Sequence, residues 1–227
     1  MKIIGISDMH GIYKGFTIPK ADILCICGDI VPLKYQNYIK LSDNWFISEF
    51  IPWCCKQPVE QVYLVGGNHD KFLMNRKYVI DQYLMGTKIN YLDNSSCEYS
   101  DDTGKIYTIF GSPDCNKFGS WAFMYEPKTE LEHFRRIPKN CDILLTHDPI
   151  YEICDVPRES IWNNTEHCGN KELRQVILEK DLKGISLCGH IHTGDKGPIK
   201  FNNLMCYNVS LLNEQYKLVV DPIIINL

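Results

Sequence analysis

The chain has 227 residues, 44% of them apolar and 23% charged, and its 24 basic and 28 acidic side chains give a net charge of −4. A chain of this length buries roughly 70% of its extended surface, so it folds around its own core without staples, and we expect one domain over residues 1–227. The acidic balance and the absence of any run of five like charges argue against long nucleic acid or an anionic membrane as a partner.

The cysteines indicate a reducing, cytoplasmic setting. Their number, 11, is odd, and none forms a C-x-x-C pair of the kind that holds zinc or exchanges disulfides. Cys25, Cys27 and Cys188 lie inside apolar runs, where they are expected to behave as small buried hydrophobes. The apolar stretch after Met1 is too short for a signal peptide, and no apolar run approaches the ~20 residues of a membrane span.

Five short apolar runs, bounded by Gly, Asp or Asn, predict buried strands. In chain order they are Lys2–Ser7, Ile23–Cys27, Gln61–Val65, Asp142–Thr146 and Ile185–Cys188. Stretches with a helical period lie between them: from Ser42 or Asp43 to Cys55, from Asp70 to Leu84 with Gly86 as the C-terminal cap, from Pro127 to Arg136, and from Asn170 to Lys180. Buried strands that alternate with helices predict an α/β fold.

Other stretches are predicted to be antiparallel strands. They are 88–92, 96–100, 105–110, 204–209 and 215–220, and the turn at 101–104 joins the second to the third as a hairpin. We therefore expect two sheets with helices outside. The apolar run Ile223–Ile225 fits either the cover of a sheet edge or a contact with a partner chain, and the sequence does not predict an oligomeric state.

Polar side chains follow each of the five buried strands. Because the carboxyl ends of such strands share one edge of the sheet, we expect these residues to meet in one crevice. They are Asp8, His10, Asp29, Asn68, His69, His147, His190 and His192. Gly28, Gly67 and Gly189 precede them, as expected where the backbone turns sharply. Taken singly, most of these residues would more often be a cap, a turn residue or a surface residue than a ligand, but five of the seven histidines fall at these strand ends.

Carboxylates, imidazoles and an amide oxygen without thiolate suit manganese, iron or zinc. The set without His69 has too many ligands for one tetrahedral ion and suits two ions bridged by Asp29. Two such ions, roughly 3.5–4 Å apart, stabilise an in-line displacement at phosphorus and lower the pKa of a water to give hydroxide near neutral pH. His69 is then expected to protonate the leaving alkoxide. Asp70 either orients His69 or, as we expect, caps the following helix.

The blocks Ser-Asp-Met-His-Gly, Gly-Asp-Ile, Gly-Gly-Asn-His-Asp, Leu-Thr-His-Asp-Pro and Gly-His-Ile-His resemble, in this order, the motif series of the calcineurin-like metallophosphoesterases. The resemblance implies a four-layer α/β/β/α sandwich of two mixed sheets with a dinuclear metal centre. It assigns Asp8, His10, Asp29 and His192 to one ion, Asp29, Asn68, His147 and His190 to the other, and catalysis to His69. Gly111-Ser112-Pro113, Trp121-Ala122-Phe123 and Asn208-Val209-Ser210 further resemble the MPPED-like branch.

One departure from the resembled family bears on the substrate. Protein serine/threonine phosphatases of this superfamily carry an Asp-Arg pair shortly after the position of Asp29, and both residues are missing from Asp29–Lys34. This argues against a phosphoprotein phosphatase. We expect a phosphodiesterase that acts on small esters such as cyclic nucleotides. A phosphomonoesterase is the closest alternative. A catalytically silent scaffold and a nuclease are disfavoured, because every site position is filled and the chain is acidic.

The stretch Gly111–Glu126 has no clear period and carries Phe118, Trp121, Phe123 and Tyr125. Irregular segments of this size are often lids or binding loops, so we consider that one ring stacks on a nucleobase. The alternative is that the rings fill the gap between sheet and helix. The residues expected to contact the substrate are Asn68, His69, Asn116 and Trp121.

Overall fold

A five-stranded sheet forms one half of the sandwich in the computed structural model, which describes residues 1–158 and 166–227. Its strands, in spatial order, are β13 (Ile223–Asn226), β1 (Lys2–Ile6), β2 (Ile23–Cys27), β3 (Gln61–Val65) and β4 (Ile89–Tyr91). β1 to β4 run parallel, and β13 pairs antiparallel with β1 at the edge. The C-terminal isoleucines therefore form an edge strand themselves.

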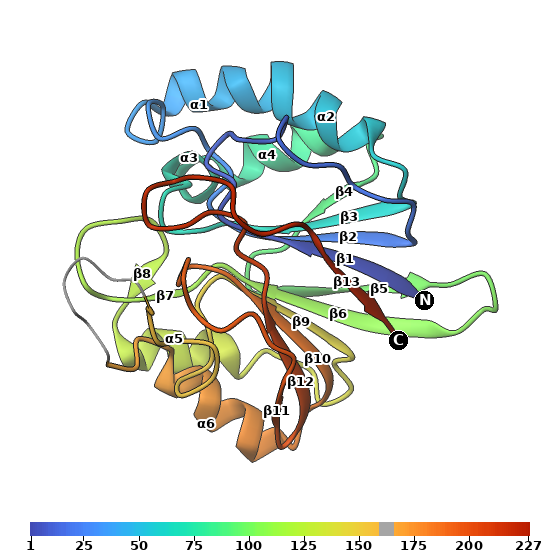
Figure 1. Cartoon of the computed structure of the whole chain (residues 1–227), viewed down its shortest axis with the longest axis vertical. Helices are drawn as coiled ribbons and strands as arrows, with labels where there is room; N and C mark the ends of the chain where they lie inside the picture. The colour runs from blue at the N-terminus through green and yellow to red at the C-terminus, as the bar shows by residue number, and fades with distance from the viewer. Residues whose placement is uncertain (159–165) are drawn as a thin grey trace.

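A six-stranded sheet forms the other half and faces the first (Figure 1). Its strands, in spatial order, are β11 (Ile199–Phe201), β12 (Asn203–Asn208), β10 (Lys183–Cys188), β9 (Ile143–Thr146), β6 (Ile106–Ser112) and β5 (Ser95–Ser100). A small two-stranded sheet joins β7 (Cys115–Asn116) to β8 (Met124–Tyr125).

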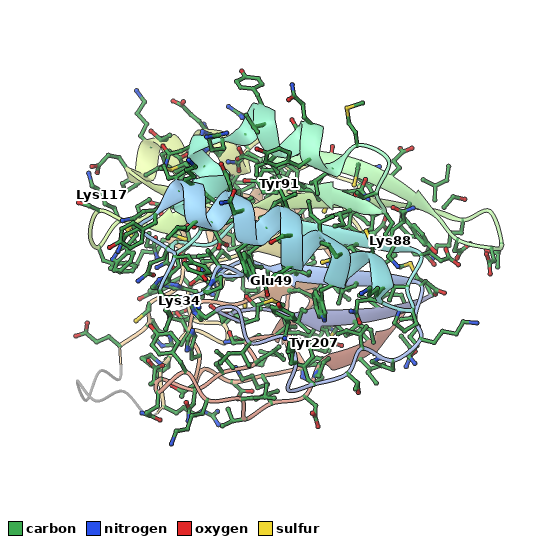
Figure 2. All side chains as sticks on the ribbon, turned by 90° about the horizontal axis from the view of Figure 1, so that it is seen from above. Lys34, Glu49, Lys88, Tyr91, Lys117 and Tyr207 are labelled. Carbon is green, nitrogen blue, oxygen red and sulfur yellow. The ribbon has the colours of Figure 1, made fainter. Side chains whose placement is uncertain are left out.

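Helices cover the outer face of each sheet (Figure 1). Over the five-stranded sheet lie α1 (Ile39–Trp45), the π-helical η1 (Phe46–Phe50), α2 (Ile51–Lys56), α3 (Lys71–Asn75) and α4 (Lys77–Leu84). Over the six-stranded sheet lie α5 (Pro127–Phe134) and α6 (Lys171–Lys180). Figure 2 shows from above how the helical run that carries Glu49 crosses the strands beneath it. The predicted four-layer α/β/β/α sandwich of two mixed sheets is confirmed.

Three apolar cores separate the four layers. Ile3 and Cys25 belong to the core between the sheets, whereas Ile4 and Leu24 belong to the core under α1–α4. A third core lies between the six-stranded sheet and its two helices. Because both faces of these strands are buried, they read as continuous apolar runs and not as an alternating pattern. No disulfide joins any of the 11 cysteines, all of which lie in the described ranges.

The first helical run begins earlier than predicted. α1 starts at Ile39, not at Ser42 or Asp43. The Ser42 hydroxyl donates a hydrogen bond to the Tyr35 carbonyl at 2.9 Å, and the Asp43 carboxylate pairs with the Arg76 guanidinium at 3.3 Å. Neither side chain therefore caps the helix.

The stretch Asp70–Leu84 forms two helices where one is predicted. Arg76, at φ −128°, separates α3 from α4. Both helices pack their apolar residues into the same core, so the hydrophobic period runs through the break without marking it. Gly86 follows α4 with φ 75°, as its predicted capping role requires. The Asn170 cap of α6 is confirmed, because its side chain accepts the Leu173 N–H at 2.9 Å.

Three strand predictions need correction. The predicted antiparallel pairing of 88–92 is wrong, because β4 pairs parallel with β3 after the crossover through α3 and α4. β12, which overlaps the predicted 204–209, pairs parallel with β10 and antiparallel with β11. The segment 215–220 forms no strand and contributes only the isolated bridge between Leu212 and Leu218. The hairpin at 101–104 is confirmed by the antiparallel pairing of β5 with β6.

The loops after β1, β2, β3, β9 and β10 gather at one end of the sandwich, opposite the chain termini (Figure 1). Contacts between the two sheets join these loops. The His147 Nδ1 lies 2.7 Å from the Cys27 carbonyl oxygen, and the His190 N–H donates to the Asp8 carboxylate at 3.0 Å. Among the described residues, none of the helices combines the length and apolar character that a bilayer crossing requires.

Candidate metal centre

The polar residues at the strand ends stand on a strained backbone. Asp8, His10, Asp29 and His190 have φ values of 54°, 43°, 52° and 66°, in the left-handed region that residues other than glycine adopt uncommonly. Backbone hydrogen bonds hold two of them in place, from Asp8 N–H to Gly28 O and from His10 N–H to Asp29 O, each 3.0 Å long. Such strain persists where the surroundings fix it, and it is frequent at functional sites.

Glycines let these loops approach one another closely, as predicted. A Cβ on Gly67 would lie 2.3 Å from the Asp29 Oδ1, and a Cβ on Gly189 would lie 2.4 Å from the Asp8 Oδ2. Gly28 adopts φ 95°. Any side chain at the first two positions would displace a carboxylate from the cluster, so the glycines are needed for its assembly.

Asp8, His10 and His192 form one group of possible ligands. One ligand atom from each lies within 4.8 Å of the others, and the His192 Nε2 is 3.5 Å from the Asp8 Oδ1. All three residues are buried. In the part of the chain that the structure describes, neither ring nitrogen of His10 has a hydrogen-bond partner. A buried imidazole without partners is costly, and a cation on one nitrogen would remove part of that cost.

Asn68, His147 and His190 form a second group. The Asn68 Oδ1 lies 3.0 Å from both the His147 Nε2 and the His190 Nδ1. These three donor atoms come from the loops after β3, β9 and β10, so the second group draws on both sheets. The His147 and His190 rings are 5.1 Å apart between centroids.

Asp29 lies between the two groups. Its Oδ2 is 3.7 Å from the His10 Nε2 on one side and 3.6 Å from the His147 Nε2 on the other. The carboxylate is 2% exposed. Asp29 therefore faces both groups at once, the position expected of a bridging ligand.

The two carboxylates stay ionised because imidazoles face them. Burial raises the pKa of Asp8 and of Asp29, but the imidazoles of His192 and His147 outweigh it and hold both pKa values well below the usual range. Burial lowers the pKa of His147 and His192, but Asp29 raises the first to about 10 and Asp8 raises the second to about 9. For His10 burial prevails and the pKa falls to about 4. The two carboxylates are therefore available as anionic ligands, the form that a cation requires.

His69 stands beside this cluster. Its backbone N–H donates to the Asp29 Oδ1 at 2.7 Å, and its Nε2 lies 3.8 Å from the Asp29 Oδ2. Its Nδ1 contacts the Gln36 amide oxygen. Gln36 could not be predicted as a partner of His69, since it lies in no motif and 33 residues away along the chain. The Trp121 ring lies 4.7 Å from the His69 ring.

A pocket of about 560 Å³ opens over the cluster. Its lining adds further side chains to those of the cluster, namely Leu33, Gln36, Phe118, Trp121, Glu214 and Tyr216. No Lys or Arg is among the described residues that line it. Beyond the imidazoles, the wall therefore combines apolar and aromatic side chains with acidic and amide ones, and no cationic side chain of the described residues faces it.

Three of the four predicted substrate contacts line this pocket: Asn68, His69 and Trp121. Asn116 does not. Its side-chain amide donates to the Cys168 carbonyl at 2.9 Å, and its backbone N–H donates to the Asp148 Oδ2 at 2.7 Å. The two interpretations of the aromatic stretch apply to different rings, because Phe123 is 1% exposed in the core whereas Phe118 is 61% exposed at the pocket.

Asp70 lies at the predicted N-cap position of α3, but its side chain makes no cap bond and, in the described part of the chain, no hydrogen bond to His69. Its carboxylate accepts hydrogen bonds from the N–H groups of Ile30, Val31 and Gly67 at 3.0–3.1 Å, and it makes no side-chain cap bond. Burial, followed by the charge of Asp29, raises the pKa of Asp70 to about 7. Asp70 thus joins the loops that carry Asp29 and Asn68.

Two further residues contact the cluster although the sequence did not predict them as site residues. The Ser210 hydroxyl donates to the Asp8 Oδ2 at 2.7 Å, and the Tyr216 ring packs edge-on against the rings of His10 and His192 at 4.9 and 5.6 Å. Ser210 belongs to a block that the resemblance singles out. No pattern in the sequence marks Tyr216 as a site residue, since its segment has the pattern of a strand.

The donor set fits divalent transition-metal ions. It combines ionised, buried carboxylates with imidazoles and an amide oxygen, and it holds no thiolate. The unpartnered nitrogens of His10 supply an independent reason for a cation in the first group.

Comparison with known proteins agrees with the geometry. The family model described as Calcineurin-like phosphoesterase matches residues 1–194. Metallophosphoesterase domain-containing protein 1 of Homo sapiens is 26% identical over 245 residues, which cover 100% of this chain and 71% of that protein. One solved structure, 15% identical in sequence, superimposes with a TM-score of 0.64 and covers 91% of this chain and 89% of its own, which supports the fold alone.

Another relative is much longer. The probable rhamnogalacturonate lyase C of Emericella nidulans is 29% identical over 200 residues, which are 86% of this chain and 17% of that protein. This chain therefore spans only a small part of that relative, and the likeness concerns that part.

Proposed function

Because this chain belongs to the calcineurin-like phosphoesterases, a family of metal-dependent phosphoric ester hydrolases, we propose that it is a phosphodiesterase acting on small esters such as cyclic nucleotides. The observation that carries this proposal is the convergence of two buried carboxylates, an amide oxygen and four imidazoles under one pocket. We assign this activity to a single domain over residues 1–227.

Two divalent ions, manganese, iron or zinc, are the proposed cofactors. Asp8, His10 and His192 would hold the first ion and Asn68, His147 and His190 the second, with Asp29 shared. When bound, such ions supply Lewis acidity toward phosphoryl oxygens and lower the pKa of a water.

His69 is the proposed general acid. Gln36 accepts a hydrogen bond from its Nδ1–H, which leaves Nε2 free on the side of Asp29 and the pocket. His69 can then give its Nε2 proton to the departing alkoxide. Trp121, packed on the ring, restricts its orientation.

The preference for a diester rests on charge. A monoester carries a second negative charge that arginine or lysine normally pairs. Among the described residues of the pocket lining there is no such side chain, and Glu214 adds negative charge. The rings of Phe118, Trp121 and Tyr216 offer faces on which a flat base could stack.

The experiment is a comparison of rates with manganese added. Purified protein should hold close to two transition-metal ions per chain and should hydrolyse bis-p-nitrophenyl phosphate faster than p-nitrophenyl phosphate. A faster monoester rate would favour a phosphomonoesterase on small metabolites, and metal binding without turnover would favour a silent scaffold. Cyclic nucleotides, nucleotide monoesters and short oligonucleotides would then be compared to identify the substrate class.

We further propose a cytoplasmic location. Of the 11 cysteines, all of them in the described ranges, eight are buried, Cys97 and Cys168 are half-buried and Cys55 is exposed, and no disulfide joins any of them. A reducing compartment would keep such thiols intact. Fractionation of cells that express the tagged chain would test this.

A further inference from the structure

Two imidazoles of the cluster are oriented by acceptors on their far side. The His147 Nδ1 lies 2.7 Å from the Cys27 carbonyl oxygen, and the His192 Nδ1 lies 3.0 Å from the Asn213 carbonyl oxygen. In both cases a main-chain acceptor fixes the proton on Nδ1 and leaves Nε2 facing the cluster. An acceptor behind a metal-binding imidazole sets its tautomer and ring orientation.

His190 is arranged the other way round. Its Nδ1 faces the cluster, 3.0 Å from the Asn68 Oδ1, and its Nε2 faces away, 3.9 Å from the Asp148 Oδ1. No main-chain oxygen is bonded to this Nε2 in the described residues. The His190 side chain is also 16% exposed, whereas that of His147 is fully buried. Of these three imidazoles, His190 therefore has the least support from packing and from the main chain.

Asp148 has a carboxylate oxygen that could accept a hydrogen bond from the His190 Nε2–H. The residue is 1% exposed, and its Oδ2 accepts the Asn116 N–H at 2.7 Å. Its Oδ1 is buried and, in the described part of the chain, has no hydrogen-bond partner. A buried carboxylate oxygen without a donor is costly, and the Nε2–H of His190 is the donor that faces it. A small rotation of the imidazole would bring the two atoms to hydrogen-bond distance.

We propose that Asp148 is a positioning residue for His190: its Oδ1 accepts the Nε2–H and thereby keeps Nδ1 unprotonated toward the second metal position. This inference rests on the proposed function, since it presumes an ion in the second group. A carboxylate is a stronger acceptor than the carbonyls behind His147 and His192. The second ion is therefore held through a side chain that substitution can remove, whereas the other two imidazoles are held by main-chain atoms.

The test is Asp148→Asn. The amide oxygen remains with the Asn116 N–H, so the NH₂ group faces the His190 Nε2 and can only donate. His190 must then carry its proton on Nδ1, where it competes with the metal. We expect the affinity of one of two zinc ions to fall roughly 10–100-fold while the other stays unchanged. Zinc titration with metal analysis measures this without any assay of activity.

Asp114→Asn is the matched control. Asp114 is also fully buried and its Oδ2 lies 2.7 Å from the His133 Nδ1, but that pair lies outside the cluster. Both zinc affinities should stay at the wild-type values in this variant. Equal loss in both variants would mean that any buried carboxylate matters to the fold, and would overturn the specific role of Asp148.

A second measurement needs no variant. Long-range ¹H–¹⁵N spectra of the zinc-loaded wild-type protein, with the His190 signals assigned, should find Nδ1 bound to zinc and Nε2 protonated. Zinc on Nε2, or wild-type affinities in Asp148→Asn, would overturn the inference and leave the proposed function in place. A wild-type protein that binds no zinc would overturn both.

Discussion

The Asp70 carboxylate accepts the backbone N–H of Val31 at 3.0 Å, and this bond ties the loop after β3 to the loop after β2. The same carboxylate accepts the Ile30 N–H from the loop after β2 and the Gly67 N–H from its own loop. Asp29 and Asn68 are sequence neighbours of Ile30 and Gly67. The spacing between two proposed metal ligands therefore depends on a side chain that touches neither ion position.

Asp70→Asn should destabilise the protein by about 1–3 kcal/mol, because one amide end is a donor and leaves a buried N–H without an acceptor. Urea unfolding at neutral pH measures the change. Asp93→Asn, which removes an exposed ion pair with Lys77, should change the free energy of unfolding by less than about 1 kcal/mol. Equal effects of the two substitutions would show that the buried hydrogen bonds of Asp70 stabilise the protein no more than an exposed ion pair does.

His69→Ala should lower kcat by roughly 10²–10⁴-fold, the usual contribution of a general acid, without loss of metal. The backbone bond from residue 69 to Asp29 is kept, so the cluster should remain assembled. Steady-state kinetics and metal analysis of the same preparation give both values. His133→Ala serves as the control, since that histidine bonds to Asp114 outside the cluster. An unaffected rate would remove His69 from the mechanism, and a lost ion would make it a ligand.

Asp29→Ala should lose both ions, because its carboxylate faces His10 and His147 from between the two groups. His10→Ala should weaken only the first ion. Among the described residues, the ligand atoms that cluster with those of His10 belong to Asp8, Asp29, His69 and His192, and to no member of the second group. Metal content after reconstitution with manganese distinguishes the two variants. Retention of one ion by Asp29→Ala would show that Asp29 does not bridge.

The stability of the fold should depend on pH through Glu130 on α5. Burial, and next to it the charge of Asp148, raises the pKa of Glu130 from 4.5 to about 8. The native state therefore binds the proton more tightly than the unfolded state does. The resulting stabilisation is complete below pH 4.5 and is lost as the pH rises through about 8.

Glu130→Gln removes this titration. Thermal unfolding across the same pH range should give a Tm that falls more steeply for the wild type than for the variant. Parallel curves for the two proteins would mean that Glu130 does not hold a proton in the native state.

The layers of the fold were predictable because both faces of the central strands are buried. Such strands read as continuous apolar runs, as in Ile23–Cys27 and Gln61–Val65, and the structure gives these two the predicted bounds. Strand direction was not predictable, since it depends on the crossover. The pattern of 88–92 is the same whether β4 runs parallel or antiparallel to β3.

The cluster was predictable for a related reason: its members follow strands that end at one edge. No sequence pattern of this kind marks the residues that hold the cluster members in place. Gln36 lies in a loop without a motif, and Tyr216 lies in a segment that reads as a strand. Asp70 had the right position for a helix cap, but its carboxylate points to donors 39 and 40 residues away, which no local pattern reveals.

The most direct measurement is anomalous diffraction from crystals of the wild-type protein grown with manganese. We predict two anomalous peaks roughly 3.5–4 Å apart. One peak should lie among Asp8, His10 and His192, the other among Asn68, His147 and His190, with Asp29 in contact with both. A single peak, or peaks that lie away from these side chains, would contradict the dinuclear account.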